Sequence, residues 1–320
     1  MKYKGVLLIK TKILVIAGPT AVGKTSLSIE MAKALDGEII SGDSMQIYKG
    51  LDIGTAKVMP DEMEGIPHYL IDEVDPSESY TVTDFQKRAK GLIADITSRG
   101  KIPIIAGGTG LYIESLLYDV SYGGEGKTDA SFRKEREALA QQKGNLYLWE
   151  TLNEIDPEAA KKIHFNNQRR VIRALEVYHV TGQPFSAYQN EREIKEAVYD
   201  AKIIGLDTDR SVLYERINLR VNQMIDAGLE KEARFLYDAN LQDTQAAKGI
   251  GYKEWFPFFE GQQTEQEVVE QIKQNSRRYA KRQLTWFRNR MEKVSWWDLV
   301  KQPTNLEKVL AEAETFFQTI

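Results

Sequence analysis

Residues 13–35 read ILVIAGPTAVGKTSLSIEMAKAL, and this stretch decides the fold class. It opens with Ile13–Ala17, a continuous apolar run typical of a parallel strand that is covered on both faces. The next eight residues fit the pattern G-x-x-x-x-G-K-S/T, and Lys24–Leu35 has the pattern of a helix that ends at Asp36-Gly37. A strand, a phosphate-binding loop and a helix in this order predict the first unit of a P-loop NTPase-like sheet.

The loop pattern provides the groups that bind a diphosphate or a triphosphate. Glycines let backbone N–H groups curve around phosphate oxygens, and the following helix presents its positive end. Lys24 adds a positive charge, and the Thr25 hydroxyl is placed to bind Mg²⁺, the cofactor that we expect. A glycine-rich turn without a ligand is the alternative. The predicted phosphate-binding residues are Gly18, Pro19, Thr20, Ala21, Val22, Gly23, Lys24 and Thr25.

Strand and helix patterns alternate along the first part of the chain and return near residue 200. Helical spacing extends over Thr81–Arg99, and another helix begins near Asp209. This alternation predicts an α/β fold, with a doubly wound, P-loop NTPase-like parallel sheet flanked by helices. The further strands are expected at Glu38–Ser41, His68–Val74, Lys101–Ala106 and Lys202–Leu206.

The strand patterns fade between about Tyr122 and Asp200, where polar helical sequence takes over. Such a long helical stretch between two strands of one sheet predicts an inserted all-helical subdomain. After Asp209 the whole sequence has a helical pattern, including Gln266–Lys293. The expected parts are residues 1–121 for the first part of the α/β core, 122–200 for the inserted helical subdomain, and 201–320 for the last strand and a helical C-terminal region.

The composition of the 320 residues excludes several kinds of chemistry. The chain has no cysteine, which rules out disulfides, thiolate metal sites, iron–sulfur clusters and cysteine nucleophiles. Its net charge is −4, so nucleic acid would have to bind at local basic patches. No apolar run approaches the roughly 18–20 residues that span a bilayer, and the apolar part of Met1–Lys10 is too short for a signal peptide. We expect a cytoplasmic protein without membrane association.

Three of the expected strands end in polar, glycine-rich sequence, at Gly18–Thr25, Ser41–Ser44 and Gly107–Gly110. The carboxyl ends of parallel strands lie at one edge of a sheet, so these segments should meet around one pocket. Asp43 would then lie beside the bound diphosphate, where its carboxylate can accept a proton from a nucleophile. A turn or N-cap aspartate is an equal alternative for Asp43. Asp72, after an apolar run, is either a Walker B-like Mg²⁺ residue or another cap.

Longer blocks of sequence resemble one family. The most diagnostic block is Asp43–Lys57, DSMQIYKGLDIGTAK, which follows the phosphate loop. From Gly18 to about Arg288, the chain resembles the tRNA dimethylallyltransferase (tRNA isopentenyltransferase) family. It is similar to the bacterial form, because a chain without cysteine lacks the zinc finger of the eukaryotic members. The other matching blocks are Pro67–Asp72, Gly107–Tyr112, Arg170–Glu176, Lys248–Lys253 and Arg278–Gln283.

The resemblance implies a reaction and three catalytic residues. Enzymes of this family move a dimethylallyl group from dimethylallyl diphosphate to N6 of the adenine 3′ of the tRNA anticodon, at position 37, giving N6-isopentenyladenosine and diphosphate. Asp43 matches the family's base for the adenine amine, and Thr109 matches a residue close to the reacting groups. Arg220 matches an arginine that contacts the diphosphate, whereas Arg216 is expected to be solvated.

Two local patches, Lys161–Arg173 and Gln266–Lys293, each carry a net charge of +5 and could bind RNA phosphates, with a solvated helix face as the alternative for each. The resemblance favours tRNA binding, because Arg169–Arg173 lies in the subdomain that is similar to the one gripping the anticodon stem-loop. Tyr279, Trp286 and Phe287 in the second patch are either RNA-facing or part of the core. The partner that the resemblance implies is the anticodon stem-loop of tRNA. The implied tRNA-binding residues are Asp43, Ser44, Met45, Gln46, Thr109, Arg133, Arg169, Arg170, Val171, Ile172, Arg173, Lys248, Gly249, Ile250, Gly251, Tyr252 and Lys253.

Two other classes of function share the phosphate loop. A small-molecule or nucleotide kinase would have the same sheet, but it would leave both basic patches unexplained. A non-catalytic RNA-binding NTPase switch would need a nucleotide-responsive loop, which the sequence does not mark. We expect a monomeric prenyltransferase.

Overall fold

The computed structural model describes residues 10–120, 128–188 and 197–319. The chain divides into two compact units. The first comprises Met1–Leu117 and Ala197–Ile320, and the second comprises Tyr118–Glu196. The three segments expected to meet at the predicted pocket, Gly18–Thr25, Ser41–Ser44 and Gly107–Gly110, all belong to the first unit.

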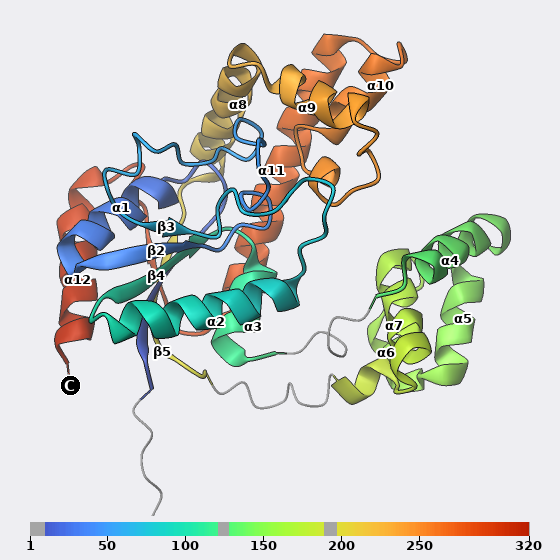
Figure 1. The fold of residues 1–320 in the computed structure, drawn as a ribbon, viewed down its shortest axis with the longest axis horizontal. Helices are drawn as coiled ribbons and strands as arrows, with labels where there is room; N and C mark the ends of the chain where they lie inside the picture. The colour runs from blue at the N-terminus through green and yellow to red at the C-terminus, as the bar shows by residue number, and fades with distance from the viewer. Residues whose placement is uncertain (1–9, 121–127, 189–196, 320) are drawn as a thin grey trace, which may run out of the picture. The chain divides into compact units, whose positions relative to one another are not determined.

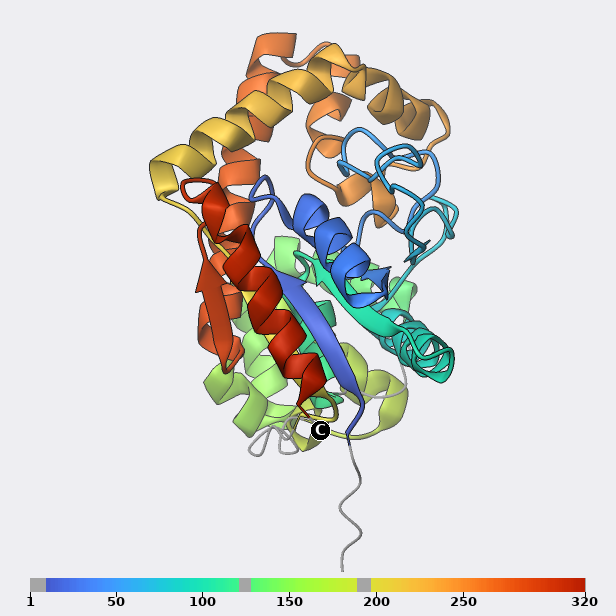
Figure 2. The same ribbon diagram turned by 90° about the vertical axis from the view of Figure 1, so that its left-hand side faces the viewer.

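A six-stranded sheet forms the centre of the first unit, with the strand order β3-β2-β4-β1-β5-β6 (Figures 1 and 2). Every pairing in it is parallel, and Val15 of the central strand lies between Ile105 and Ile203. The predicted parallel α/β sheet is confirmed. The strands are β1 (Lys12–Ala17), β2 (Gly37–Ser41), β3 (His68–Tyr69), β4 (Ile102–Gly107), β5 (Asp200–Leu206) and β6 (Val294–Trp297).

Helices cover the sheet because its strands are apolar on both faces. In β1, Leu14 and Ile16 belong to a buried cluster that includes residues of α1, α8 and α12, and the alternate residues Ile13 and Val15 are equally buried. The helices α2 and α11 each begin at a capping box, which satisfies their first N–H groups. The helices of this unit are α1 (Lys24–Leu35), α2 (Val82–Ser98), α3 (Gly110–Tyr118), α8 (Arg210–Asp226), α9 (Leu229–Asp238), α10 (Phe256–Phe259), α11 (Glu265–Arg290) and α12 (Leu306–Gln318).

Two expectations about the strands are wrong. The strand expected at His68–Val74 ends at Tyr69, because Leu70 and Asp72 have φ values of 62° and 55°, outside the strand region. The segment after Asp209 is not entirely helical, because β6 follows α11 and pairs with β5. Only four residues long, β6 is too short for a period-two pattern to be recognised in the sequence.

The second unit is helical in its described residues. Its core contains Leu148, Leu152, Ala160 and Val171, which are all nearly inaccessible to solvent. Asp129 and Asp156 cap the first and third helices through their side chains. The helices are α4 (Ala130–Lys143), α5 (Asn145–Ile155), α6 (Pro157–Lys162) and α7 (Gln168–Thr181).

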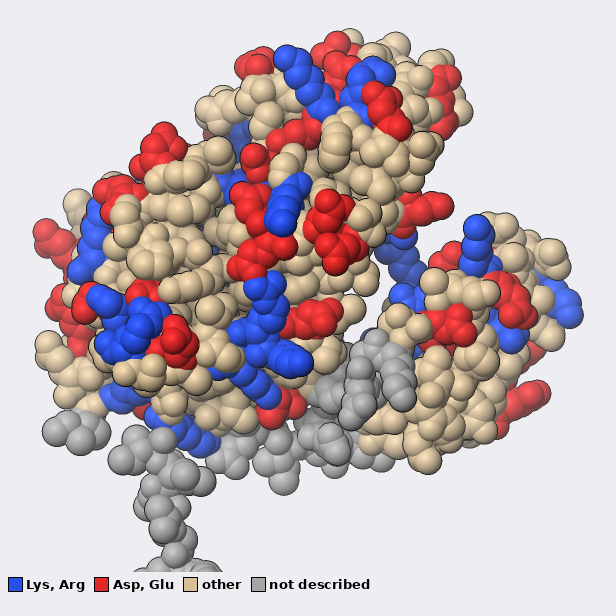
Figure 3. Space-filling model, viewed as in Figure 1, with Lys and Arg blue, Asp and Glu red and all other residues tan. Residues whose placement is uncertain are grey.

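The charged surface agrees with the small net charge. Figure 3 shows Lys and Arg side chains interspersed with Asp and Glu on the face in view, in each unit. Among the described residues, none of the helices combines the length and the apolar character that crossing a bilayer requires.

Candidate functional site

The loops after β2 and β4 are bonded to each other at the edge of the sheet. The Gly42 N–H donates to the carbonyl of Ala106 over 2.8 Å, and the Thr109 N–H donates to the carbonyl of Gly42 over 3.2 Å. A Cβ atom on Gly107 would lie 2.3 Å from the backbone of Gly42, so this close approach requires glycine. Because β4 lies between β2 and β1, the phosphate loop after β1 is the next neighbour.

The phosphate loop makes a tight turn that depends on its glycines. Gly23 has a φ of 101°, and a Cβ atom on Gly18 would lie 2.6 Å from the carbonyl oxygen of Leu206. The side chains of Ala21 and Val22 are buried, so these residues offer only their backbone to a ligand. The turn is therefore built to present peptide N–H groups at the start of α1.

Lys24 supplies the positive charge of the loop. Its Nζ donates to the carbonyl of Pro19 over 2.7 Å. Burial lowers the pKa of Lys24 to about 8, while the Asp43 carboxylate raises it and Arg220 lowers it. A buried ammonium with so little compensating charge is a strong binding group for an anion. Lys24 and Thr25 both line a small cavity with a volume of about 80 Å³.

The position of Asp43 suits both of the roles that the sequence left open. Its Oδ1 accepts the Met45 N–H over 2.9 Å, which is the bond of a turn aspartate. Its carboxyl also lines the small cavity beside Lys24 and the larger one beside Arg220. Burial raises the pKa of Asp43, although the bond from Met45 and the charge of Lys24 act against this increase. The turn holds the carboxylate in place, and burial makes it more basic than an exposed aspartate.

Thr109 contacts the loop of Asp43 directly. Its Oγ1 accepts the Ser44 N–H over 3.0 Å and lies 3.2 Å from the Ser44 hydroxyl. Thr109 is therefore beside the predicted base, as the resemblance implied, and it fixes the backbone next to that base.

Two arginines of α8, one helical turn apart, reach the phosphate loop. Nη1 of Arg220 lies 3.5 Å from the Thr20 hydroxyl. Burial lowers the pKa of Arg220, and the neighbouring Arg216 adds to this effect. Arg216 is exposed, as expected, and its Nε also donates to the carbonyl of Ala21 over 2.8 Å, a contact that the sequence did not predict. Residues i and i+4 of a helix share a face, so both guanidinium groups point to the same loop.

A cavity of about 300 Å³ opens beside Asp43 and Arg220. Its walls come from the loop after β2, from α8 and α11, and from the segment 248–253. Lys248 and Lys253 are exposed at this cavity, so their charges are accessible to an anionic ligand. The structure thus brings together the predicted catalytic residues and part of the predicted tRNA-binding set.

Tyr279 and Gln283 of α11 are site residues that the sequence did not single out. Burial and the nearby Asp43 carboxylate raise the pKa of Tyr279, whose hydroxyl hydrogen-bonds to Thr109. Gln283 is buried and bonds to the phosphate loop and to Gly108. Both lie in the Arg278–Gln283 block, but the sequence offered Tyr279 only as an RNA-facing or core aromatic. Phe287, by contrast, is fully buried in the core.

The Asp43–Lys57 block is mainly a framework for the site. The buried Lys57 forms ion pairs with Asp52 and Asp72 and donates to the carbonyl of Tyr48. The Walker B-like reading of Asp72 loses its basis, because the strand ends three residues earlier and the carboxylate pairs with Lys57. Gln46 accepts from the hydroxyl of Ser41 at the end of β2 over 2.9 Å and is partly exposed, so its expected contact with tRNA stays a prediction.

Glu232 of α9, which lies outside the Asp43–Lys57 block, holds residues 52–54 of that block in place. Its carboxylate accepts the backbone N–H groups of residues 52–54 over 2.8 to 3.1 Å and the hydroxyl of Tyr252 over 3.0 Å. Tyr252, an implied tRNA contact, is therefore fully buried and supports the loop from behind. In the sequence, Glu232 is only an acidic residue on an amphipathic helix, and nothing there indicates its bonds to residues 52–54.

We predict that Glu232→Gln loosens residues 52–54. A neutral amide has one acceptor oxygen, and its NH₂ group would face N–H donors, so about 2 kcal/mol of local stability is lost. Hydrogen exchange of these three amides should become roughly 30-fold faster. The control is Glu230→Gln on the same helix, whose carboxylate forms only an exposed pair with Arg234. Unchanged exchange in Glu232→Gln would show that the carboxylate does not hold the loop.

The second unit distributes its predicted tRNA-binding residues between core and surface. Val171 and Ile172 are 1% and 3% exposed, so their side chains serve the helical core instead. Arg133 and Arg173 both pair with the buried Glu176; burial opposes ionisation of Glu176, but these bonds outweigh it and lower its pKa. At the start of α7, Arg169 is exposed, and its binding to tRNA stays a prediction.

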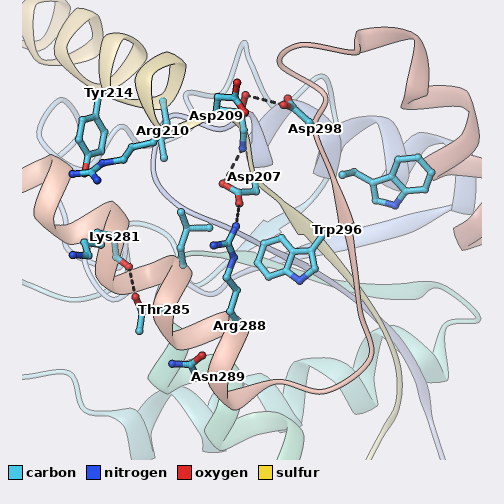
Figure 4. Close-up of a pocket in the computed structure, with 14 residues that line it drawn as sticks. Asp207, Asp209, Arg210, Tyr214, Lys281, Thr285, Arg288, Asn289, Trp296 and Asp298 are labelled. Carbon is cyan, nitrogen blue, oxygen red and sulfur yellow. Dashed lines mark hydrogen bonds and ion pairs between the residues drawn. The ribbon is translucent and has the colours of Figure 1, made fainter.

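A larger cavity of about 760 Å³ lies at the ends of β5 and β6, between α8 and α11 (Figure 4). Acidic and basic side chains are balanced in its lining: Arg288 pairs with Asp207, and Thr208 donates to Asp298 over 3.0 Å. The predicted catalytic and phosphate-binding residues do not line it, although Lys281, Thr285 and Arg288 of the basic patch Gln266–Lys293 do. The candidate active site is therefore the smaller, more basic cavity at Asp43.

The fold and the site define a P-loop NTPase-like α/β protein with a carboxylate facing its phosphate loop. The family model described as IPP transferase matches residues 46–290. The chain belongs to this family.

Relatives match over nearly the whole chain. A tRNA dimethylallyltransferase of Geobacillus thermodenitrificans is 54% identical over 309 residues, covering 97% of this chain and 96% of that protein. The crystal structure of the full-length tRNA isopentenylpyrophosphate transferase from Bacillus halodurans superposes with a TM-score of 0.71 at 46% identity, covering 96% of this chain and 97% of that one. The crystal structure of a eukaryotic dimethylallyltransferase acting on tRNA gives a TM-score of 0.80 at 32% identity, covering 96% of this chain and 79% of that one.

Proposed function

We propose that this chain is a tRNA dimethylallyltransferase, which transfers a dimethylallyl group from dimethylallyl diphosphate to N6 of adenine 37 in tRNA. The observation that carries the proposal is the position of Asp43, a buried carboxylate between the cationic phosphate loop and a cavity with a basic rim. A small-molecule kinase can also use a carboxylate base, but it would leave the exposed Lys248 and Lys253 at the cavity unexplained.

The donor's diphosphate binds at the phosphate loop in this proposal. Breaking the allylic C–O bond leaves the bonding electrons on the diphosphate oxygen. Backbone N–H groups, Lys24 and Arg220 stabilise that charge, because all three are fixed before the reaction begins. Arg216 supports the loop itself through the carbonyl of Ala21.

The residues at the loop also fit Mg²⁺. Mg²⁺ binds oxygen ligands and often uses only one or two from protein, with water and phosphate oxygens completing its shell. The small cavity carries the Thr25 and Ser28 hydroxyls and the Asp43 carboxylate, which is a donor set of that kind. Thr25 would hold the ion, and bound Mg²⁺ supplies further neutralisation of the leaving diphosphate.

Asp43 acts on the acceptor. The lone pair of an aromatic exocyclic amine is delocalised into the ring, so the amine is a weak nucleophile. As the new N6–C bond forms, one N–H proton passes to the Asp43 carboxylate, and the amine becomes a neutral secondary amine. The raised pKa of Asp43 favours this transfer.

The tRNA contacts divide between the two units. Lys248 and Lys253 offer positive charge at the cavity, and Ser44 and Met45 line it. In the second unit, Arg169 and Arg170 at the start of α7 are proposed to bind phosphates of the anticodon stem-loop. The residues proposed for catalysis all belong to one chain, so we propose that the enzyme acts as a monomer. We also propose that it is located in the cytoplasm, where tRNA is present.

We predict that replacing Arg169 and Arg170 by glutamine weakens tRNA binding. The KM for tRNA should rise about 10-fold, and the slope of log affinity against log salt should decrease by about 1 to 2. A binding titration across salt concentrations measures both. The control removes two exposed charges elsewhere, with Lys87→Gln and Lys308→Gln, and should leave the slope unchanged. An unaltered slope in the first variant would exclude the patch.

One assay tests the proposed function against its alternatives. Labelled dimethylallyl diphosphate and ATP are offered together with unmodified tRNA, and nucleoside analysis identifies the product. Incorporation of the prenyl label into adenine 37, with none into a tRNA carrying guanine there, supports the proposal. Consumption of ATP with phosphorylation of a small acceptor would favour a kinase instead.

A further inference from the structure

Gln283 of α11 joins two loops of the candidate active site. It is only 5% exposed. Its Oε1 accepts the backbone N–H of Thr20 over 3.0 Å, and its Nε2 donates to the carbonyl of Gly108 over 3.0 Å. One side-chain amide therefore links the phosphate loop after β1 to the loop after β4.

Each end of this link lies next to a group of the proposed reaction. On the donor side, the hydroxyl of Thr20 lies 3.5 Å from Nη1 of Arg220. On the acceptor side, Gly108 precedes Thr109, whose Oγ1 accepts the Ser44 N–H over 3.0 Å. Ser44 is the neighbour of Asp43, so short contacts connect the diphosphate site with the base through Gln283.

The surface of the loop after β4 is shaped for α11. A Cβ atom on Gly108 would lie 2.1 Å from Nε2 of Gln283, and a Cβ atom on Gly110 would lie 2.3 Å from the ring of Trp286. Gly110 therefore lets the helix approach, whereas a Cβ atom at position 108 would displace the amide end of Gln283. The packing at Gly110 is independent of the two hydrogen bonds and helps to place the amide between the loops.

Only a side chain with one donor and one acceptor can form both bonds. Glutamine has both, whereas methionine has neither, and an ionised glutamate lacks the donor. Loss of the amide would leave the Thr20 N–H and the Gly108 carbonyl unpaired in a buried place, which favours movement of the two loops apart.

We propose that Gln283 is a positioning residue, which fixes the distance between the bound diphosphate and Asp43 during prenyl transfer. The inference rests on the proposed function and deepens it. Gln283 touches neither substrate in this role. It sets the geometry in which the allylic carbon, held by its leaving group, meets the adenine amine.

The test uses single-turnover prenylation of tRNA by the full-length protein. Gln283→Met keeps the length of the side chain and removes both bonds, so the rate at saturating substrates should fall about 10- to 100-fold. The KM values for donor and tRNA should change less than about 3-fold, because the binding groups themselves remain. Gly108→Ala, whose Cβ displaces the amide, should give the same split.

Gln283→Glu provides a rescue that a purely structural role would not give. A protonated carboxyl has one O–H donor and one acceptor, as the amide does, whereas the carboxylate has acceptors only. The rate relative to wild type should therefore rise as the pH falls from about 8 to 6, since burial raises the pKa of a carboxyl. Measuring wild type at each pH removes the titration of Asp43, Lys24 and Tyr279, which face the same site, from the comparison.

Gln318→Met, on the exposed end of α12, is the matched control and should behave as wild type. A Gln283→Met enzyme with an unchanged rate, or a Gln283→Glu enzyme whose relative rate does not depend on pH, would overturn the proposal. If the wild-type protein makes no prenylated tRNA, the proposed function fails instead, and the two failures are distinct.

Discussion

Asp43→Ala is expected to lower the single-turnover rate of prenyl transfer about 10²- to 10⁴-fold, the usual range for a lost general base. The affinity for tRNA should stay within about 3-fold of wild type, because basic residues elsewhere supply most of the attraction. Rapid-quench analysis of the prenylated nucleoside measures the rate, and a filter-binding titration measures the affinity. A near-normal rate of chemistry in the variant would exclude Asp43 as the base.

Asp43→Asn separates the base from the turn residue. An asparagine keeps an oxygen that can accept the Met45 N–H, as Oδ1 of Asp43 does over 2.9 Å, but it cannot take up the proton of the amine. If catalysis needs the base, both variants are slow. An active Asn variant beside an inactive Ala variant would mean that Asp43 only shapes the turn. The pH dependence adds a check: activity needs the carboxylate, so it is lost as the pH falls through a pKa that burial has raised.

Lys24→Met is expected to produce the second large effect. It removes the positive charge beside the proposed leaving diphosphate, so kcat/KM for the donor should fall about 10²- to 10³-fold. The KM for tRNA should change little. Lys33→Met on the same helix is the matched control, because Lys33 pairs with Glu30 and Glu64 at the surface and should leave both constants unchanged. If kcat/KM for the donor were the same in both variants, the diphosphate would not bind at the phosphate loop.

The pKa of Lys24 gives this prediction a pH profile. With a pKa of about 8 in the absence of ligand, Lys24 is mostly an ammonium below pH 8 and loses its charge above it. Donor affinity should therefore weaken as the pH rises through about 8. In Lys24→Arg the guanidinium stays charged at this pH. The affinity of this variant for the donor can differ from that of wild type, but it should not decline as the pH rises through about 8. A decline of equal size in both would assign the titration to another group.

The local sequence by itself determined the fold class and the centre of the site. The apolar run of β1, the glycine-bounded loop and the helix that begins at Lys24 depend on neighbouring residues, so a pattern of about 20 residues specifies them. The meeting of the loops after β1, β2 and β4 also followed, because parallel strands place their carboxyl ends on one edge. The sequence pattern therefore predicts that Asp43 and Thr109 lie near each other, and the structure places Thr109 against Ser44, the neighbour of Asp43.

The long-range partners were decided only by the tertiary structure. Whether Asp72 binds a metal or pairs with Lys57, and whether the exposed Arg216 also bonds to the phosphate loop, depends on residues far away in the chain. The same holds for Tyr252, which has an aromatic side chain that suits either RNA or a buried bond to Glu232. Sequence patterns report the period of burial within one element, and they do not report which other element covers it.

Gln283 shows the difference most clearly. Its bonds to Thr20 and Gly108 connect residues 263 and 175 positions apart, and a single glutamine on a charged helix carries no local sign of them. The sequence predicts which groups bind phosphate and offers a candidate proton acceptor, because that chemistry belongs to individual side chains and short loops. The tertiary structure decided how far apart those groups are held, because that distance is set by packing between helices and loops that meet only in the folded chain.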